Sequence, residues 1–184
     1  MRRLIPLAVL CALAACSGPV TSEEGPTERG VDGYYGYGVA GRDLKLEVAG
    51  NAFPGRLSDA AFAQGLAGRL KTPPERQAGH ITLTPGPSAR SNYSLIFQFN
   101  PGPMLYGQEL CAGKRTQQPP EPGRVKVLAS FCVAGRAITE ISGQTDATGP
   151  GDPRFGTLMD EMMAKLFRTT RRFYYNQGGH TRAQ

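Results

Sequence analysis

The chain of 184 residues has no hydrophobic run long enough to cross a membrane. Its longest apolar run extends from Leu4 to Ala15, which is twelve residues. Because a bilayer core of about 30 Å requires about 20 apolar residues in a helix, this run cannot span it. A buried core helix would explain neither Arg2 and Arg3 ahead of the run nor the polar composition from Ser17 onward. The run is instead typical of a cleaved signal peptide at residues 1–15.

Residues suited to metal or phosphate chemistry are scarce. The two histidines, His80 and His180, lie a hundred residues apart, and no His, Cys, Asp or Glu pair has zinc-site spacing. A Gly-x-Ser-x-Gly elbow and a phosphate-binding loop are both absent. Gly36, Gly38 and Gly41 match the glycine spacing of dinucleotide-binding turns, but that motif needs a helix after it and a strand pattern follows. The sequence therefore predicts no metal, no cofactor and no recognisable catalytic group.

Cysteine is also rare, and its four positions fall into two groups. Cys11 lies in the apolar run, and Cys16 directly follows it. The other two, Cys111 and Cys132, are 21 positions apart, and Cys132 lies in a strand-like run. In an oxidising compartment we expect these two to form a structural disulfide, which would stabilise the fold by roughly 3 kcal/mol. A redox-active pair is the alternative, but such cysteines are usually separated by only two residues.

Acidic residues are missing from the last twenty positions, where five of the basic residues lie. The rest of the mature chain is close to neutral, which argues against a nucleic-acid surface spread over the domain. In the tail at residues 169–184, arginines are interleaved with aromatic residues, which suits contact with anionic headgroups, lipopolysaccharide phosphates or an acidic partner. A frayed terminus that only improves solubility is the alternative. The residues that would make the contact are Arg168, Arg171, Arg172 and Arg182.

The apolar run ends in Leu13-Ala14-Ala15-Cys16, which resembles the lipobox of bacterial lipoprotein precursors. The resemblance implies that Cys16 receives a diacylglycerol, that residues 1–15 are removed and that the new amino group is acylated. Two or three acyl chains would hold the protein on its membrane for a long time. In Gram-negative lipoproteins an aspartate after the cysteine commonly signals retention at the inner membrane, and Ser17 stands there instead. The resemblance therefore implies a lipid anchor in the outer membrane, on its periplasmic face. An ordinary secreted protein, cut near Ala15, is the alternative.

Beyond Cys16 the sequence divides into a tether, one domain and the tail. Residues 16–42 are rich in Gly, Pro, Ser, Glu and Thr, which predicts a flexible stalk. Residues 43–168 carry periodic apolar patterns and are long enough for one hydrophobic core. A tight turn at residues 134–136 is expected to close a hairpin. The runs typical of strands are residues 44–48, 80–83, 93–99, 125–133 and 137–142.

Two amphipathic helices are expected in this domain. Ser58 can cap the first, whose apolar residues recur every four positions until Thr72-Pro73-Pro74 stops it. Asp152 and Pro153 begin the second. Between the third and fourth of the expected strands, residues 104–123 read as a long loop that contains Cys111. The predicted fold class is α+β, with a small, mostly antiparallel sheet of about five strands and both helices packed on one face.

Three functions remain open, and the first is favoured. It is a non-enzymatic interaction or accessory module of the cell envelope, with an envelope protein or glycan as its partner. The second is an envelope hydrolase with an unrecognised site, for which Glu140 or the pair Asp160-Glu161 could supply carboxyl groups; solvated charges on amphipathic elements explain all three residues more simply. The third is a binder of a small apolar ligand, which requires a cavity between sheet and helices. The oligomeric state stays open.

Overall fold

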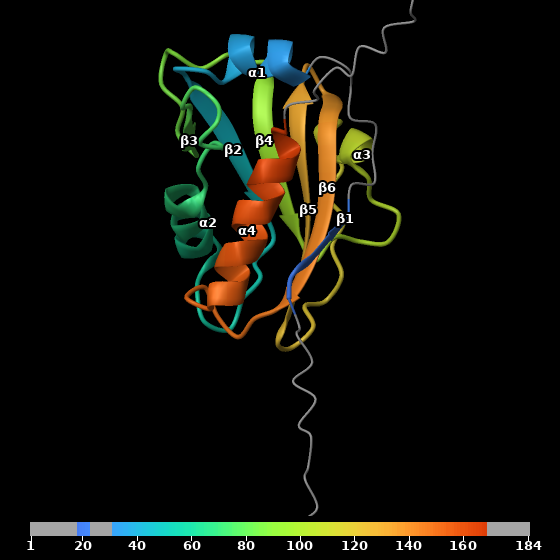
Figure 1. Cartoon of the computed structure of the whole chain (residues 1–184). Coiled ribbons are helices and arrows are strands. Elements are labelled where there is room, and N and C mark those ends of the chain that lie inside the picture. Colours follow the sequence, from blue (N-terminus) through green and yellow to red (C-terminus); the bar gives the residue numbers. More distant parts are fainter. Residues whose placement is uncertain (1–17, 23–30, 169–184) are drawn as a thin grey trace, which may run out of the picture.

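The structure, a computed structural model, describes residues 18–22 and 31–168 (Figure 1). These residues form a sheet with the strand order β1-β6-β5-β4-β2-β3. The pairs that join β1 to β6, β6 to β5 and β5 to β4 are antiparallel, whereas β2 is parallel to both β4 and β3. In chain order the elements are β1 (Val20–Ser22), α1 (Val31–Gly38), β2 (Asp43–Ala49), α2 (Asp59–Arg69), β3 (His80–Thr82), β4 (Tyr93–Phe99), α3 (Gly107–Cys111), β5 (Arg124–Val133), β6 (Arg136–Asp146) and α4 (Pro153–Leu166).

The α+β class is confirmed, but the sheet is mixed rather than mostly antiparallel. Helix α2 carries the chain from the end of β2 back to the beginning of β3, so the two strands run in the same direction. Strand β4 then pairs with the other side of β2, also in parallel, with Leu46 opposite Leu95. The expectation of antiparallel pairing is therefore wrong for this half of the sheet, because a helical crossover rather than a tight turn joins β2 to β3.

The main core lies between one face of the sheet and the helices α1, α2 and α4. Figure 1 shows α2 and α4 in front of the sheet, as the sequence predicts, and α1 across one end of it. Every second residue of β4 and β5 points into this core. The ring centroids of Phe99 and Phe62 are 4.8 Å apart, and those of Phe131 and Phe167 are 5.2 Å apart. Ser58 caps α2 by accepting a hydrogen bond from the main-chain N–H of Ala61 at 3.2 Å.

A second, smaller core covers the opposite face of the sheet. It contains Ile96, Leu105, Leu110, Leu128 and Cys132 and lies under α3, a short helix inside the segment that the sequence predicts to be a long loop. The expected disulfide is confirmed: it joins Cys111, the last residue of α3, to Cys132 of β5, with 5.6 Å between their Cα atoms. The bond fastens the loop and its helix to the sheet, which has few apolar residues on this side.

The stalk expected for residues 16–42 is wrong where the structure describes it. Val31 and Tyr35 of α1 are buried in the main core, and the Tyr35 hydroxyl donates a hydrogen bond of 2.8 Å to the carbonyl of Gln77. Strand β1 pairs with β6, and the hydroxyls of Ser22 and Ser142 lie 2.7 Å apart. The many glycines of this segment conceal an apolar spacing of four residues, from Val31 through Tyr35 to Val39.

Candidate functional site

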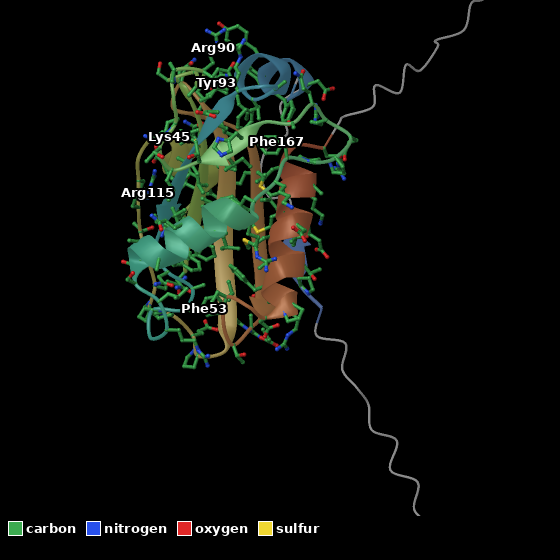
Figure 2. All side chains as sticks on the ribbon, turned by 90° about the vertical axis from the view of Figure 1, so that its left-hand side faces the viewer. Lys45, Phe53, Arg90, Tyr93, Arg115 and Phe167 are labelled. Carbon is green, nitrogen blue, oxygen red and sulfur yellow. A yellow bond between two sulfur atoms is a disulfide. The ribbon has the colours of Figure 1, made fainter. Side chains whose placement is uncertain are left out.

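Three loops meet at one end of the sheet and enclose a groove of about 520 Å³. They are residues 50–58 between β2 and α2, residues 118–123 before β5, and residues 147–152 between β6 and α4. We call this the groove end of the domain. Figure 2 shows Phe53 there, while Arg90 and Tyr93 lie at the opposite end. The groove is lined by apolar and charged side chains that include Phe53, Pro54, Arg56, Pro120, Glu121, Pro122 and Arg124.

The first of these loops is held by one buried asparagine. The side-chain amide of Asn51 donates to the carbonyl of Leu57 at 2.9 Å and to the carboxylate of Asp59 at 3.1 Å. Its carbonyl oxygen accepts from the main-chain N–H of Phe53 at 2.7 Å. Because the side chain is 6% exposed and these bonds engage both of its polar ends, the loop is fixed before any ligand arrives.

A second asparagine joins the loops to one another. Asn100, directly after β4, donates from its side chain to the carbonyl of Asn51, and its own carbonyl accepts from the N–H of Gln118 at 2.8 Å. Next to it, Gly50 has a φ of +75° and leaves room for the Gln117 side chain: a Cβ on Gly50 would lie 2.0 Å from Nε2 of Gln117. The rim of the groove is therefore a hydrogen-bonded frame built from three distant parts of the chain.

The groove continues into two further hollows. The first, of about 640 Å³, follows the connection from β6 to α4 and shares Arg56 and Thr148 with the groove. The second, of about 240 Å³, lies between α2 and α4 and shares Pro150 with the first. Its lining is mainly apolar, with one arginine: Leu57, Phe62, Gly65, Leu66, Arg69, Pro150 and Phe155.

Most charged side chains around the groove are paired with one another. Arg124 contacts Asp146 at 3.3 Å, Arg154 contacts Asp152 at 2.9 Å, and Lys126 pairs with Glu121. Hydrogen bonds from the Arg154 side chain, and then from the backbone N–H groups of Arg154 and Thr148, hold the pKa of Asp152 well below its usual range. These pairs leave the rim with little net charge.

Arg56 differs from these residues, because no carboxylate of the described residues forms an ion pair with it. It is exposed, and its guanidinium lies beside Gly149, 3.7 Å from where a Cβ on that glycine would be. A planar guanidinium with free donors, next to proline and phenylalanine surfaces, can bind an anion that carries an apolar part. The arrangement is therefore suited to binding.

The carboxyl groups weighed from the sequence lie elsewhere. Glu140 in β6 is 8% exposed, and its side chain packs against the start of α3, where a Cβ on Gly107 would lie 2.7 Å from Oε2. Its interpretation as a solvated charge is therefore wrong. On α4, Asp160 is exposed and Glu161 is half-buried. Glu140 lines neither the groove nor its two continuations.

His80 is exposed and pairs with Asp43 at 3.0 Å. A hydrogen bond from the backbone N–H of Gly86, followed by one from His80, holds the pKa of Asp43 below its usual value. Within residues 18–22 and 31–168, no cluster of three or more His, Cys, Asp or Glu side chains could hold a metal ion. His180 lies outside the described residues.

The remaining predicted residues belong to the anchor and the tail. Arg168 is exposed and follows α4, whose last residues lie at the end of the sheet away from the groove, next to α1 (Figure 1). Cys16, Arg171, Arg172 and Arg182 lie outside the described residues. In the part of the chain that the structure describes, no helix has the length and hydropathy needed to cross a bilayer.

Sequence reasoning did not find the groove. Its loops are rich in proline and glycine, which predicts turns, but nothing in the composition shows that residues 50–58, 118–123 and 147–152 meet. The signal present was local: Asn51 and Asn100 each follow a strand, where a short amide side chain commonly bonds to nearby backbone. No family model, no curated protein and no solved structure matches the chain.

Proposed function

We propose that the chain is a lipoprotein of the outer membrane, anchored through Cys16 on the periplasmic face, and that its domain binds another component of the envelope without catalysing a reaction. The lipobox-like residues 13–16 support the anchor. The disulfide between Cys111 and Cys132 supports an exported protein, because such bonds persist in oxidising compartments.

The groove is the observation that carries the binding role. Asn51 and Asn100 fix two of its three loops, so a ligand would not have to pay the entropic cost of ordering them. The lining combines apolar surface with Arg56, a cation that forms no ion pair with a carboxylate of the described residues. Sites with a mainly apolar lining and a few placed polar groups are typical of ligand binding.

The anchor is tested by replacing the cysteine. Cys16→Ser is expected to abolish incorporation of labelled lipid and to move the protein from the membrane fraction to the soluble periplasm. Ser17→Asp is the matched variant: it leaves Cys16 in place and is expected to move the protein from outer-membrane to inner-membrane fractions. A Cys16→Ser protein that stays on the membrane with an unchanged mass would show that the anchor is wrong.

The binding role is tested by photo-cross-linking in cells. A photoreactive residue at position 55, on the groove, is compared with one at position 36, on α1 at the opposite end. A Cβ added at either position would have no neighbouring atom within 4 Å, so both positions tolerate a side chain. We expect envelope components to be captured from position 55 and not from position 36. Equal capture from both, or none from position 55, contradicts a binding role for the groove.

A further inference from the structure

Strand β1 fixes where the chain leaves the domain. Its first residue, Val20, pairs with Gln144 of β6, and Gln144 pairs in turn with Lys126 of β5, so the three residues form one row across the sheet. Gln144 lies two residues before the end of β6, and Lys126 lies two residues after the beginning of β5. Both ends border the groove. The chain therefore enters β1 from the groove end.

The distance from this row to Cys16 is short. Four residue steps separate Cys16 from Val20, and an extended chain covers at most about 14 Å in four steps. The ten residues of β5 reach about 33 Å from the groove end to the turn at the other end of the sheet. A lipid on Cys16 therefore keeps the groove end near the bilayer, whereas the length of β5 allows the opposite end, with α1, to lie about 33 Å farther away.

The surface at the groove end suits a lipid–water interface. Pro54, Pro120 and Pro122 are exposed there, and their rings offer apolar surface without a backbone N–H that would lose its water. Arg56 forms no ion pair with a carboxylate of the described residues, so its donors are available for a phosphate oxygen. Arg124 and Arg154 are already paired with carboxylates, so a phosphate is attracted more strongly to Arg56 than to either of them.

We infer that, in the anchored protein, the groove end rests on the bilayer and Arg56 binds the phosphates of lipid headgroups. The inference rests on the proposed anchor at Cys16 and names the envelope component that the groove meets. Because α4 runs away from the groove, the basic tail after Arg168 then begins on the side facing the periplasm. Arg56 is then the residue of the groove end that contacts the lipid phosphates.

The orientation is tested with two variants of the acylated full chain, Gly55→Cys and Gly36→Cys, each of which adds one cysteine. Both glycines are exposed and have open space around them, so neither substitution introduces a steric clash. The native thiols do not compete for the label, because Cys111 and Cys132 are bonded to each other and Cys16 carries lipid. Each variant is labelled with a fluorophore and reconstituted in vesicles of phosphatidylethanolamine and phosphatidylglycerol that contain a headgroup-attached nitroxide quencher. We expect strong quenching at position 55 and little at position 36. Equal quenching, or stronger quenching at position 36, overturns the inference.

The role of Arg56 is tested in the same vesicles with labelled Gly55→Cys. Adding Arg56→Gln is expected to lower the ratio of quenched to unquenched label about fivefold, because one basic residue is lost from an anionic surface. Arg90→Gln, at the opposite end, removes the same charge and is expected to leave the ratio unchanged. Equal ratios for Arg56→Gln and the parent protein show that Arg56 does not contact the phosphates, and overturn that part of the inference.

Mass spectrometry of the same samples separates the two proposals. A chain without acyl groups on Cys16 refutes the anchor, and the orientation falls with it. An acylated chain whose label at position 55 is not quenched refutes the orientation alone. If position 55 is not quenched but cross-links to an envelope protein in cells, the groove binds a protein, and the lipid assignment is overturned while the proposed function stands.

Discussion

The side-chain amide of Asn100 donates a hydrogen bond of 3.2 Å to the main-chain carbonyl of Asn51, and so joins the end of β4 to the loop after β2 across 49 residues. Asn100 has a φ of +48°, in the left-handed region that few side chains other than asparagine and glycine adopt easily. Both residues are buried. Asn100 therefore adopts the positive φ with which the chain leaves β4, and its side chain also fixes the frame of the groove.

Asn100→Ala is expected to lower the free energy of unfolding by about 2 kcal/mol, because it removes a buried hydrogen bond and keeps an unfavourable φ. Asn100→Gly removes the same bond but relieves the backbone, so its loss is expected to be smaller. Urea denaturation of the two variants measures the contribution of the hydrogen bond and that of the unfavourable φ. The account of Asn100 is wrong if the glycine variant is the less stable of the two.

Two glycines of α1 form a matched pair. A Cβ on Gly38 would lie 2.1 Å from Cδ1 of the buried Tyr93 ring, so Gly38→Ala is expected to destabilise the protein by about 2 kcal/mol. Nothing lies within 4 Å of a Cβ on Gly36, and Gly36→Ala is expected to stabilise it by up to about 1 kcal/mol through helix propensity. Thermal unfolding followed by circular dichroism compares them. Two neutral variants would mean that α1 is not packed on the sheet in solution.

Reduction of the disulfide is expected to lower the free energy of unfolding by about 3 kcal/mol, because opening a loop of 21 positions restores conformational freedom to the unfolded chain. Urea denaturation with and without dithiothreitol measures the loss. The double variant Cys111→Ala with Cys132→Ala should reproduce it and be insensitive to the reductant. An unchanged midpoint for the reduced wild-type protein would contradict a stabilising role.

Asp152 is expected to make stability depend on pH in the acid range. Its hydrogen bonds with Arg154 and Thr148 hold its pKa in the folded protein below the ordinary value of 3.8, so the ionised carboxylate stabilises the fold. This stabilisation is complete above pH 3.8 and is lost as the pH falls toward the folded-state pKa. Asp152→Asn keeps a good helix cap but lacks the charge. Urea midpoints should therefore differ between the two proteins at pH 7 and converge as the pH falls below about 4; a constant difference contradicts the role given to the charge.

Features that depend on neighbouring residues could be predicted from the sequence. The turn at Ala134 and Gly135 has φ values of +50° and +76°, as a two-residue hairpin requires, and it follows from the glycine between two alternating runs. Ser58 and Asp152 mark the starts of α2 and α4 because their side chains bond to N–H groups only two or three residues ahead. The disulfide followed from cysteine arithmetic.

Features that depend on distant residues could not be predicted. The parallel pairing of β2 with β4 depends on the path of the chain through α2, β3 and residues 83–92, and no local pattern in β2 distinguishes parallel from antiparallel neighbours. Helix α1 is not evident from the sequence because its glycines lower its helix propensity, and only packing of Val31 and Tyr35 on the sheet compensates for that. The groove is hidden for the same reason: its loops are joined by contacts between residues far apart in the sequence, such as the hydrogen bond of Asn100 with Asn51, 49 positions away.

The brevity of β1 bears on how far an anchored domain can travel. Strand β1 has three residues and lies at the margin of the sheet, so fluctuations can detach it at a low cost in free energy. If Cys16 carries the proposed lipid, four residue steps connect it to the sheet while β1 is paired, and fifteen steps, at most about 50 Å of chain, connect it to Val31 of α1 once β1 detaches. In the anchored protein, pairing or detachment of this one short strand would then determine whether the domain stays at the membrane surface or extends into the periplasm.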